Sequence, residues 1–148
     1  MAKTITVRGF TLVELIMALA IMAILAVYVL PRFFSVGVYQ ERGFADQVQA
    51  VLRYAQKAAI AQHRAVCAAY TASPERLSLS ITVTTSCDTA LSVPASSVNY
   101  IEAPSGIAFS MTPASISFDA LGRPSASAVA TVGTATITVE AETGYVHQ

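Results

Sequence analysis

The sequence predicts an α+β protein in which a long N-terminal helix packs on a C-terminal head built from an antiparallel β-sheet. Three observations predict it: an apolar run near the N-terminus, a helical stripe of apolar residues after it, and alternation of apolar and polar residues from about Ala65 onward. The 148 residues are 54% hydrophobic and 12% charged, which excludes a disordered or collagen-like chain and leaves room for one compact domain.

The apolar run extends from residue 10 to residue 31, with 17 consecutive uncharged residues between Glu14 and Arg32. As a helix, its 22 residues are about 33 Å long. That length is enough to cross the bilayer core of about 30 Å. We therefore expect residues 10–31 to form a transmembrane helix, which becomes the first half of the long N-terminal helix.

Two ordinary interpretations of this run fit less well. A cleaved secretory signal has a shorter apolar region followed by a small-residue cleavage site, whereas this run is followed by Pro31, Arg32 and two phenylalanines. A plain membrane anchor gives no role to Glu14, because an acid inside an apolar span costs a few kcal/mol and usually marks a functional site.

The run opens with Gly9-Phe10-Thr11-Leu12-Val13-Glu14-Leu15, after a short segment that carries Lys3 and Arg8. This combination resembles the type III signal of type IV pilins and pseudopilins. The resemblance implies that residues 1–9 are a leader, that prepilin peptidase cuts between Gly9 and Phe10, and that Phe10 becomes N-methylated. It also implies a single-pass inner-membrane protein with a cytoplasmic N-terminus and a periplasmic head. Such a protein then enters a pilus or pseudopilus at an inner-membrane assembly platform, through contacts with other pilins.

The residues of the motif suit these roles. Gly9 has no Cβ, so its backbone can lie close to the catalytic groups of a peptidase. Glu14 follows Phe10 by about one helical turn, and the resemblance implies that its carboxylate pairs with the amine of Phe10 on a neighbouring subunit. Such a pair removes most of the cost of a charge in hydrocarbon and would select one axial register. The alternative is that the carboxylate extends to the lipid headgroups.

Residues 32–64 continue the helix as its amphipathic half. Pro31 is expected to kink the helix, because it removes an intrahelical hydrogen bond. The opposite face is basic, with a net charge of +3 over these residues, and is most simply a solvated face. An apolar stripe at helical spacing comprises Phe44, Val48, Val51, Leu52, Ala55, Ala58 and Ala59.

Residues 65–148 are expected to form the β-rich head. Residues 77–84, 115–118 and 134–139 alternate apolar and polar side chains, and turn signals follow at 119–124 and 142–144. Such strands have one face to bury, and the apolar helical stripe is the predicted cover. The head carries a net charge of −4, which disfavours nucleic acid as a partner.

Two narrower resemblances concern other parts of the chain. Residues 30–34 and 41–61 are similar to minor pilins of the mannose-sensitive haemagglutinin (MSHA) pilus, of the MshC kind. Residues 115–125 and 136–146 resemble the head of the GspH/FimT class of minor pilins and pseudopilins.

Cys67 and Cys87 are the only cysteines, and both fall in the part expected outside the inner membrane. A disulfide is expected in an oxidising compartment. Closing a loop of about 20 residues stabilises a fold by roughly 3 kcal/mol. Two separate buried thiols are the alternative. Two cysteines and two histidines without ligand spacing predict no metal site, and we expect no cofactor.

No catalytic motif is present. His63 and His147 have no nearby residues that suggest a nucleophile and base, and the sequence contains no G-x-S-x-G, P-loop or H-E-x-x-H. The expected function is therefore that of a non-enzymatic minor pilin that helps to initiate or cap a filament. A pseudopilin of a type II secretion system is the alternative, and a membrane-anchored periplasmic enzyme is a remote one.

Overall fold

A computed structural model describes residues 9–33, 36–83 and 86–148 of the chain, without the side chains of 27–36. The chain divides into two units, one containing helix α1 and the other comprising Gly37–Gln148. The helices are α1 (Leu12–Phe33) and α2 (Val36–Gln62). The strands are β1 (Val66–Ala72), β2 (Glu75–Thr82), β3 (Cys87–Ala90), β4 (Tyr100–Glu102), β5 (Phe109–Thr112), β6 (Ser115–Phe118), β7 (Ala128–Val132), β8 (Ala135–Val139) and β9 (Val146–His147).

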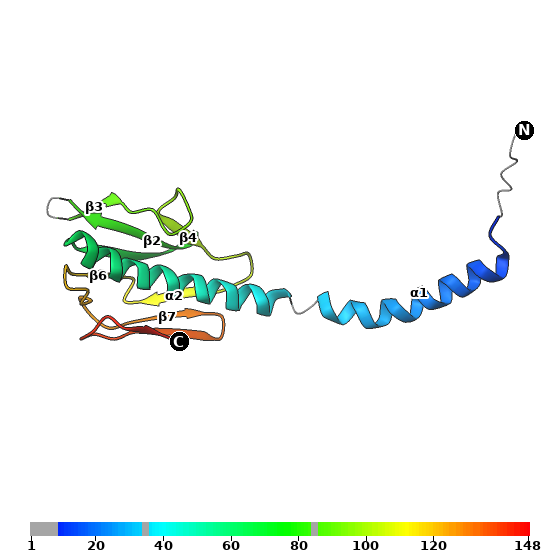
Figure 1. Ribbon diagram of the computed structural model, residues 1–148. Helices are drawn as coiled ribbons and strands as arrows, with labels where there is room; N and C mark the ends of the chain where they lie inside the picture. Colours follow the sequence, from blue (N-terminus) through cyan, green and yellow to red (C-terminus); the bar gives the residue numbers. More distant parts are fainter. Residues whose placement is uncertain (1–8, 34–35, 84–85) are drawn as a thin grey trace, which may run out of the picture. The chain divides into compact units, whose positions relative to one another are not determined.

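The second unit, which comprises α2 and the β-rich residues and is called the head below, contains two antiparallel sheets. The first has the strand order β3-β2-β1-β6, with β4 also paired to β2, and the second has the order β5-β7-β8-β9. In Figure 1 the green strands β2 to β4 lie on one side of α2, and the orange strand β7 lies on the other. The predicted α+β class, a helix packed on an antiparallel β head, is confirmed, with two sheets where one was expected.

Helix α2 supplies one face of the core. All seven residues of the predicted stripe are buried, and Ala45 joins them. Small alanines at one end and larger side chains at the other let the backbone of α2 lie close to the strands, as dense core packing requires. The strands contribute the residues of their buried faces, among them Leu77, Leu79, Ile116 and Ile137.

Phe109 at the start of β5 connects the second sheet to α2 and to the first sheet. Its ring makes edge-to-face contacts with Phe44 of α2 and Tyr70 of β1, with ring centroids 5.5 and 5.1 Å apart. Its backbone is bound as well, because its N–H donates to Glu75 Oε2 and its carbonyl accepts from the Tyr70 hydroxyl. Ring packing and paired backbone groups together hold the second sheet to α2 and to the first sheet at Phe109.

The predicted strands correspond to β2, β6 and β8. Their apolar positions point into the core, as the period of two requires: Leu77, Leu79 and Ile81 in β2, Ile116 and Phe118 in β6, and Ile137 and Val139 in β8. The predicted turn at 119–124 is closed by Asp119, whose Oδ1 accepts the N–H groups of Leu121 and Arg123. Asp side chains favour such turns for this reason.

Helix α2 ends where the backbone of His63 takes a left-handed conformation, with φ 50°. The N–H of Arg64 then donates back to the carbonyl of Ala59, which satisfies one of the last carbonyls of the helix. His63 is thus the helix terminator and is exposed to solvent.

Pro31 lies within the backbone of α1. The side chains of residues 27–36, which include Pro31 and the end of the predicted span, lie outside the described residues. Among the residues that the structure describes, neither helix has the length and apolar character needed to cross a membrane.

Candidate processing and assembly site

The start of α1 brings together the three residues that the sequence predicts for processing and assembly, which are Gly9, Phe10 and Glu14. Gly9, Phe10 and Thr11 precede the helix, and Phe10 is 82% exposed. The N–H of Glu14 donates to Thr11 Oγ1 at 3.2 Å, and the N–H of Leu15 donates to the Thr11 carbonyl at 3.1 Å. Gly9, Phe10, Thr11 and Glu14 line one hollow of about 520 Å³. The predicted cleavage residues and the predicted assembly acid therefore share one surface.

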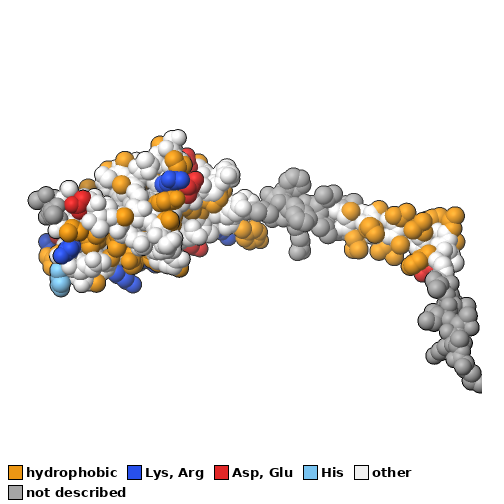
Figure 2. Space-filling view, turned by 90° about the horizontal axis from the view of Figure 1, so that it is seen from above, with side chains coloured by type: hydrophobic (Ala, Val, Ile, Leu, Met, Phe, Trp, Pro, Cys, Tyr) orange, Lys and Arg blue, Asp and Glu red, His pale blue; other side chains and the backbone are white. Residues whose placement is uncertain are grey.

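The described part of α1 carries exposed apolar side chains at positions all around the helix, and the face that Figure 2 shows is mostly hydrophobic. Its large apolar side chains are all more than half exposed: Leu12, Val13, Leu15, Ile16, Met17, Leu19, Ile21, Met22, Ile24 and Leu25. Glu14 is the acid of its first turn. A helix that is apolar on all sides is unstable when water surrounds it. Helix α1 therefore needs a cover of lipid or of other helices.

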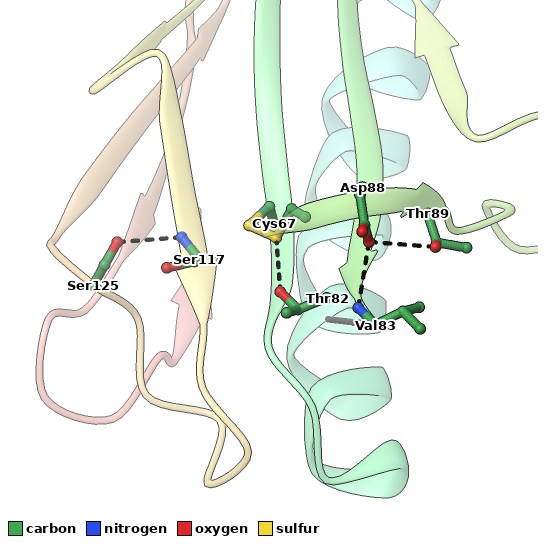
Figure 3. Close-up of a disulfide and its surroundings, with 8 residues drawn as sticks. Cys67, Thr82, Val83, Asp88, Thr89, Ser117 and Ser125 are labelled. Atoms are coloured by element: carbon green, nitrogen blue, oxygen red, sulfur yellow. Dashed lines mark hydrogen bonds between the residues drawn. A yellow bond between two sulfur atoms is a disulfide. The ribbon is translucent and has the colours of Figure 1, made fainter. Parts of the chain in front are cut away.

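In the head, Cys67 of β1 and Cys87 of β3 form a disulfide, with Cα atoms 6.0 Å apart. Strand β2 lies between β1 and β3 in the sheet, so the disulfide joins two strands that are not hydrogen-bonded to each other. Figure 3 shows its surroundings: Thr82 Oγ1 lies 3.3 Å from Cys87 Sγ, and Asp88 Oδ1 accepts the N–H of Val83. The disulfide therefore cross-links β1 to β3 at this end of the first sheet.

We expect Cys87→Ser to destabilise a head fragment that lacks residues 1–31. A disulfide between residues 20 positions apart contributes about 3 kcal/mol. For a domain of this size, that loss lowers the melting temperature by about 10 °C. Thermal unfolding followed by circular dichroism measures it, and reduction of the wild-type head should produce the same drop. Two titratable thiols in the native, unreduced protein would contradict the prediction.

Three polar side chains of α2 bind backbone groups of the C-terminal segments. Arg53 donates to the carbonyl of Val146 from Nε at 3.1 Å and from Nη2 at 2.9 Å. Gln56 Nε2 donates to the carbonyls of Gly122 and Thr143. These contacts hold the second sheet against the helix. Arg53 belongs to the basic face of residues 32–64 that the sequence predicts to be solvated, and nothing in the sequence distinguishes Gln56 from a solvated residue.

Glu41 is the third of these side chains. Its Oε1 accepts the hydroxyl of Thr134 at 2.7 Å and the N–H of Thr134 at 2.5 Å, in the turn between β7 and β8. These two bonds, the hydroxyl first, lower the pKa of Glu41 from its ordinary value of 4.5, and Arg42 adds a smaller effect in the same direction. Hydrogen bonds to a carboxylate favour its charged form.

This lowered pKa predicts a loss of stability in acid. A carboxyl group whose pKa is lower in the folded protein than in the unfolded chain stabilises the fold. For Glu41 this stabilisation is complete above the unfolded-state pKa near 4.5, and it is lost as the pH falls through the folded-state pKa. Glu41→Gln has no charge to lose, so the advantage of the wild type over this variant should shrink as pH falls from 5 to 3. Melting temperatures of the head across this range test it, with Thr134→Val as a second variant that removes the larger cause. A difference that is constant with pH would contradict the prediction.

The remaining titratable residues form no candidate catalytic arrangement within the described ranges. His147 Nε2 lies 3.0 Å from Glu140 Oε1, and its ring stacks on Tyr145. The residues that the structure describes contain no group of three or more His, Cys, Asp or Glu that could hold a metal ion.

Comparison with known proteins gives two findings. Residues 6–30 match the family described as the prokaryotic N-terminal methylation motif. Two crystal structures of the Pseudomonas aeruginosa type IV minor pilin FimU are similar to this chain, both with a TM-score of 0.52. Their sequence identities are 14% and 16%, over 72% and 77% of this chain and 90% of FimU. No curated protein matches the sequence.

Proposed function

We propose that this chain is a structural minor pilin that helps to initiate or cap a type IV pilus. The proposal is supported by its N-terminal methylation motif and by the likeness of its fold to that of a type IV minor pilin. The single observation that carries the proposal is the arrangement at the start of α1. An exposed, non-helical Gly9-Phe10 pair leads directly into a helix that is apolar all round and has an acid in its first turn.

The first step of this function is processing. Prepilin peptidase removes residues 1–9 at the cytoplasmic side of the inner membrane, and the new amine on Phe10 is methylated. The exposure of Phe10 and the absence of helix at Gly9 support the step, because a peptidase must reach the backbone on both sides of the bond.

The second step is transfer of α1 from lipid to other helices. An apolar helix is stable in the bilayer and equally stable in the centre of a bundle of similar helices, so transfer costs little hydrophobic energy. Glu14 is the exception, since its charge gains most where a cation meets it. Pairing with the methylated amine of a neighbouring Phe10 would place each subunit in one axial register.

The third part is the head, which stays in the periplasm until the subunit enters the filament. A disulfide and its own hydrophobic core support independent folding of residues 37–148 before assembly. The resemblance of residues 41–61 to MSHA minor pilins supports assignment to a pilus of that type.

Mass analysis of the N-terminus tests the function directly. The protein purified from membranes that contain prepilin peptidase should begin with a methylated Phe10. Gly9→Leu should leave the precursor uncut, because a side chain at this position blocks the close approach of the backbone. A mature protein that begins at any other residue would overturn the proposal.

A second measurement separates a pilus from a secretion pseudopilus. Cells are sheared, and the ratio of this protein to the major pilin is measured in the filament fraction. A small, constant ratio supports a minor pilin. Absence from sheared filaments, together with impaired protein secretion in a strain lacking the chain, would assign it to a type II secretion system instead.

A further inference from the structure

Thr11 stands between the predicted scissile bond and the helix, and its bonds mark where the helix begins. Leu12 is the first helical residue. The Thr11 hydroxyl accepts the N–H of Glu14, and the Thr11 carbonyl accepts the first intrahelical bond, from Leu15. These two bonds define an N-cap residue, whose side chain satisfies an N–H group that the helix itself leaves unpaired.

The spacing from Thr11 to Glu14 is that of a capping box, in which a threonine and a glutamate three residues later close the first turn. The bond present in the structure uses the backbone N–H of Glu14 and not its carboxylate. The start of the helix therefore depends on the side chain of Thr11, whereas the carboxylate of Glu14 takes no part in this bond.

We propose that Thr11 is a positioning residue for leader cleavage: by capping α1 it keeps Gly9 and Phe10 outside the helix, where a peptidase can bind their backbone in an extended form. This inference rests on the proposed function, because it requires cleavage between Gly9 and Phe10. The four residues Gly9, Phe10, Thr11 and Glu14 line the same hollow, so an enzyme that reaches the bond meets the capped turn beside it.

The chemistry of the N-cap explains why its position matters. The carbonyl of an N-cap residue accepts the first hydrogen bond of the helix. Without the Thr11 hydroxyl, the nearest upstream residue that caps about as well as threonine is Gly9. A helix that began there would tie up the Gly9 carbonyl, which is the group that the peptidase must attack. Capping at Thr11 leaves that carbonyl free.

The experiment measures initial cleavage rates of the full-length chain in membrane vesicles by purified prepilin peptidase, from the gel shift on leader loss. Thr11→Val keeps the shape of the side chain and removes the acceptor, and we expect cleavage to be about fivefold slower. Thr11→Ser and Thr11→Asn are strong N-caps, and their rates should stay within about twofold of wild type. Met17→Leu, on α1 outside this hollow, leaves the capped turn unchanged and should be cut at the wild-type rate.

Formation of the Cys67–Cys87 disulfide on non-reducing gels shows whether each variant is folded. A wild-type rate for Thr11→Val would overturn the inference while leaving the proposed function intact. Slow cleavage of Thr11→Ser and Thr11→Asn would overturn it as well, because the peptidase would then be reading the threonine itself. A wild-type chain that is not cut between Gly9 and Phe10 would instead overturn the proposed function.

Discussion

Glu14→Val should abolish entry into filaments while leaving the processed protein abundant in the inner membrane. The substitution removes a charge from an apolar helix and so makes insertion easier. It spares the Thr11 bond, which uses the backbone of Glu14, and it lies outside the folded head. The expected loss is at least tenfold in the sheared filament fraction, with normal leader cleavage by gel shift.

Two further substitutions at this position test whether the charge is responsible. Glu14→Gln has nearly the same shape without the charge and should behave like Glu14→Val. Glu14→Asp keeps the charge on a shorter side chain, so incorporation should be intermediate. Normal incorporation of Glu14→Val would mean that helix packing alone sets the axial register.

Gly144→Ala should destabilise the head by about 3–4 kcal/mol. Gly144 has a φ of 66°, a conformation that costs a residue with a Cβ about 1–2 kcal/mol. Its Cβ would overlap the carbonyl oxygen of Gly122 and lie 2.7 Å from Gln56 Nε2. The two hydrogen bonds of Gln56 would then be lost or strained, at about 1 kcal/mol each.

Gly106→Ala is the matched control. Gly106 has a φ of 85°, but a Cβ there meets no atom within 4 Å, so only the backbone cost of about 1–2 kcal/mol applies. Gln56→Ala removes the two hydrogen bonds without straining the backbone. Urea unfolding of the head measures all three variants. Equal losses for Gly144→Ala and Gly106→Ala would show that the contact among Gln56, Gly122 and Gly144 adds nothing.

The sequence by itself determined the features that depend on residues close together in the chain. The apolar run of α1, the stripe of α2 and the alternation of β2, β6 and β8 are periodic patterns, and periodicity specifies which face an element buries. The motif from Gly9 to Glu14 is equally local. The expected oxidising compartment, together with the presence of two cysteines, predicted that Cys67 and Cys87 would be bonded, and the structure contains that bond.

The tertiary structure alone decided how these elements are partnered. Alternation shows that a strand has a buried face, but it does not show that β1 pairs with β6 or that β5 begins a second sheet. Those pairings join residues far apart in sequence, and they depend on how the two sheets share the apolar stripe of α2. The role of Phe109 could not be predicted for the same reason, because its partners Phe44 and Tyr70 come from other elements.

The polar contacts of α2 were also decided at this level. The side chains of Glu41, Arg53 and Gln56 lie beside the apolar stripe of α2. From the sequence alone, a polar side chain at such a position is expected to face water. Each becomes a partner of a backbone group only because the fold brings that group within hydrogen-bond distance: Thr134 for Glu41, Val146 for Arg53, and Gly122 and Thr143 for Gln56. The period of a helix fixes which side chains point away from the core, whereas the fold fixes which of them meet water and which meet another part of the chain.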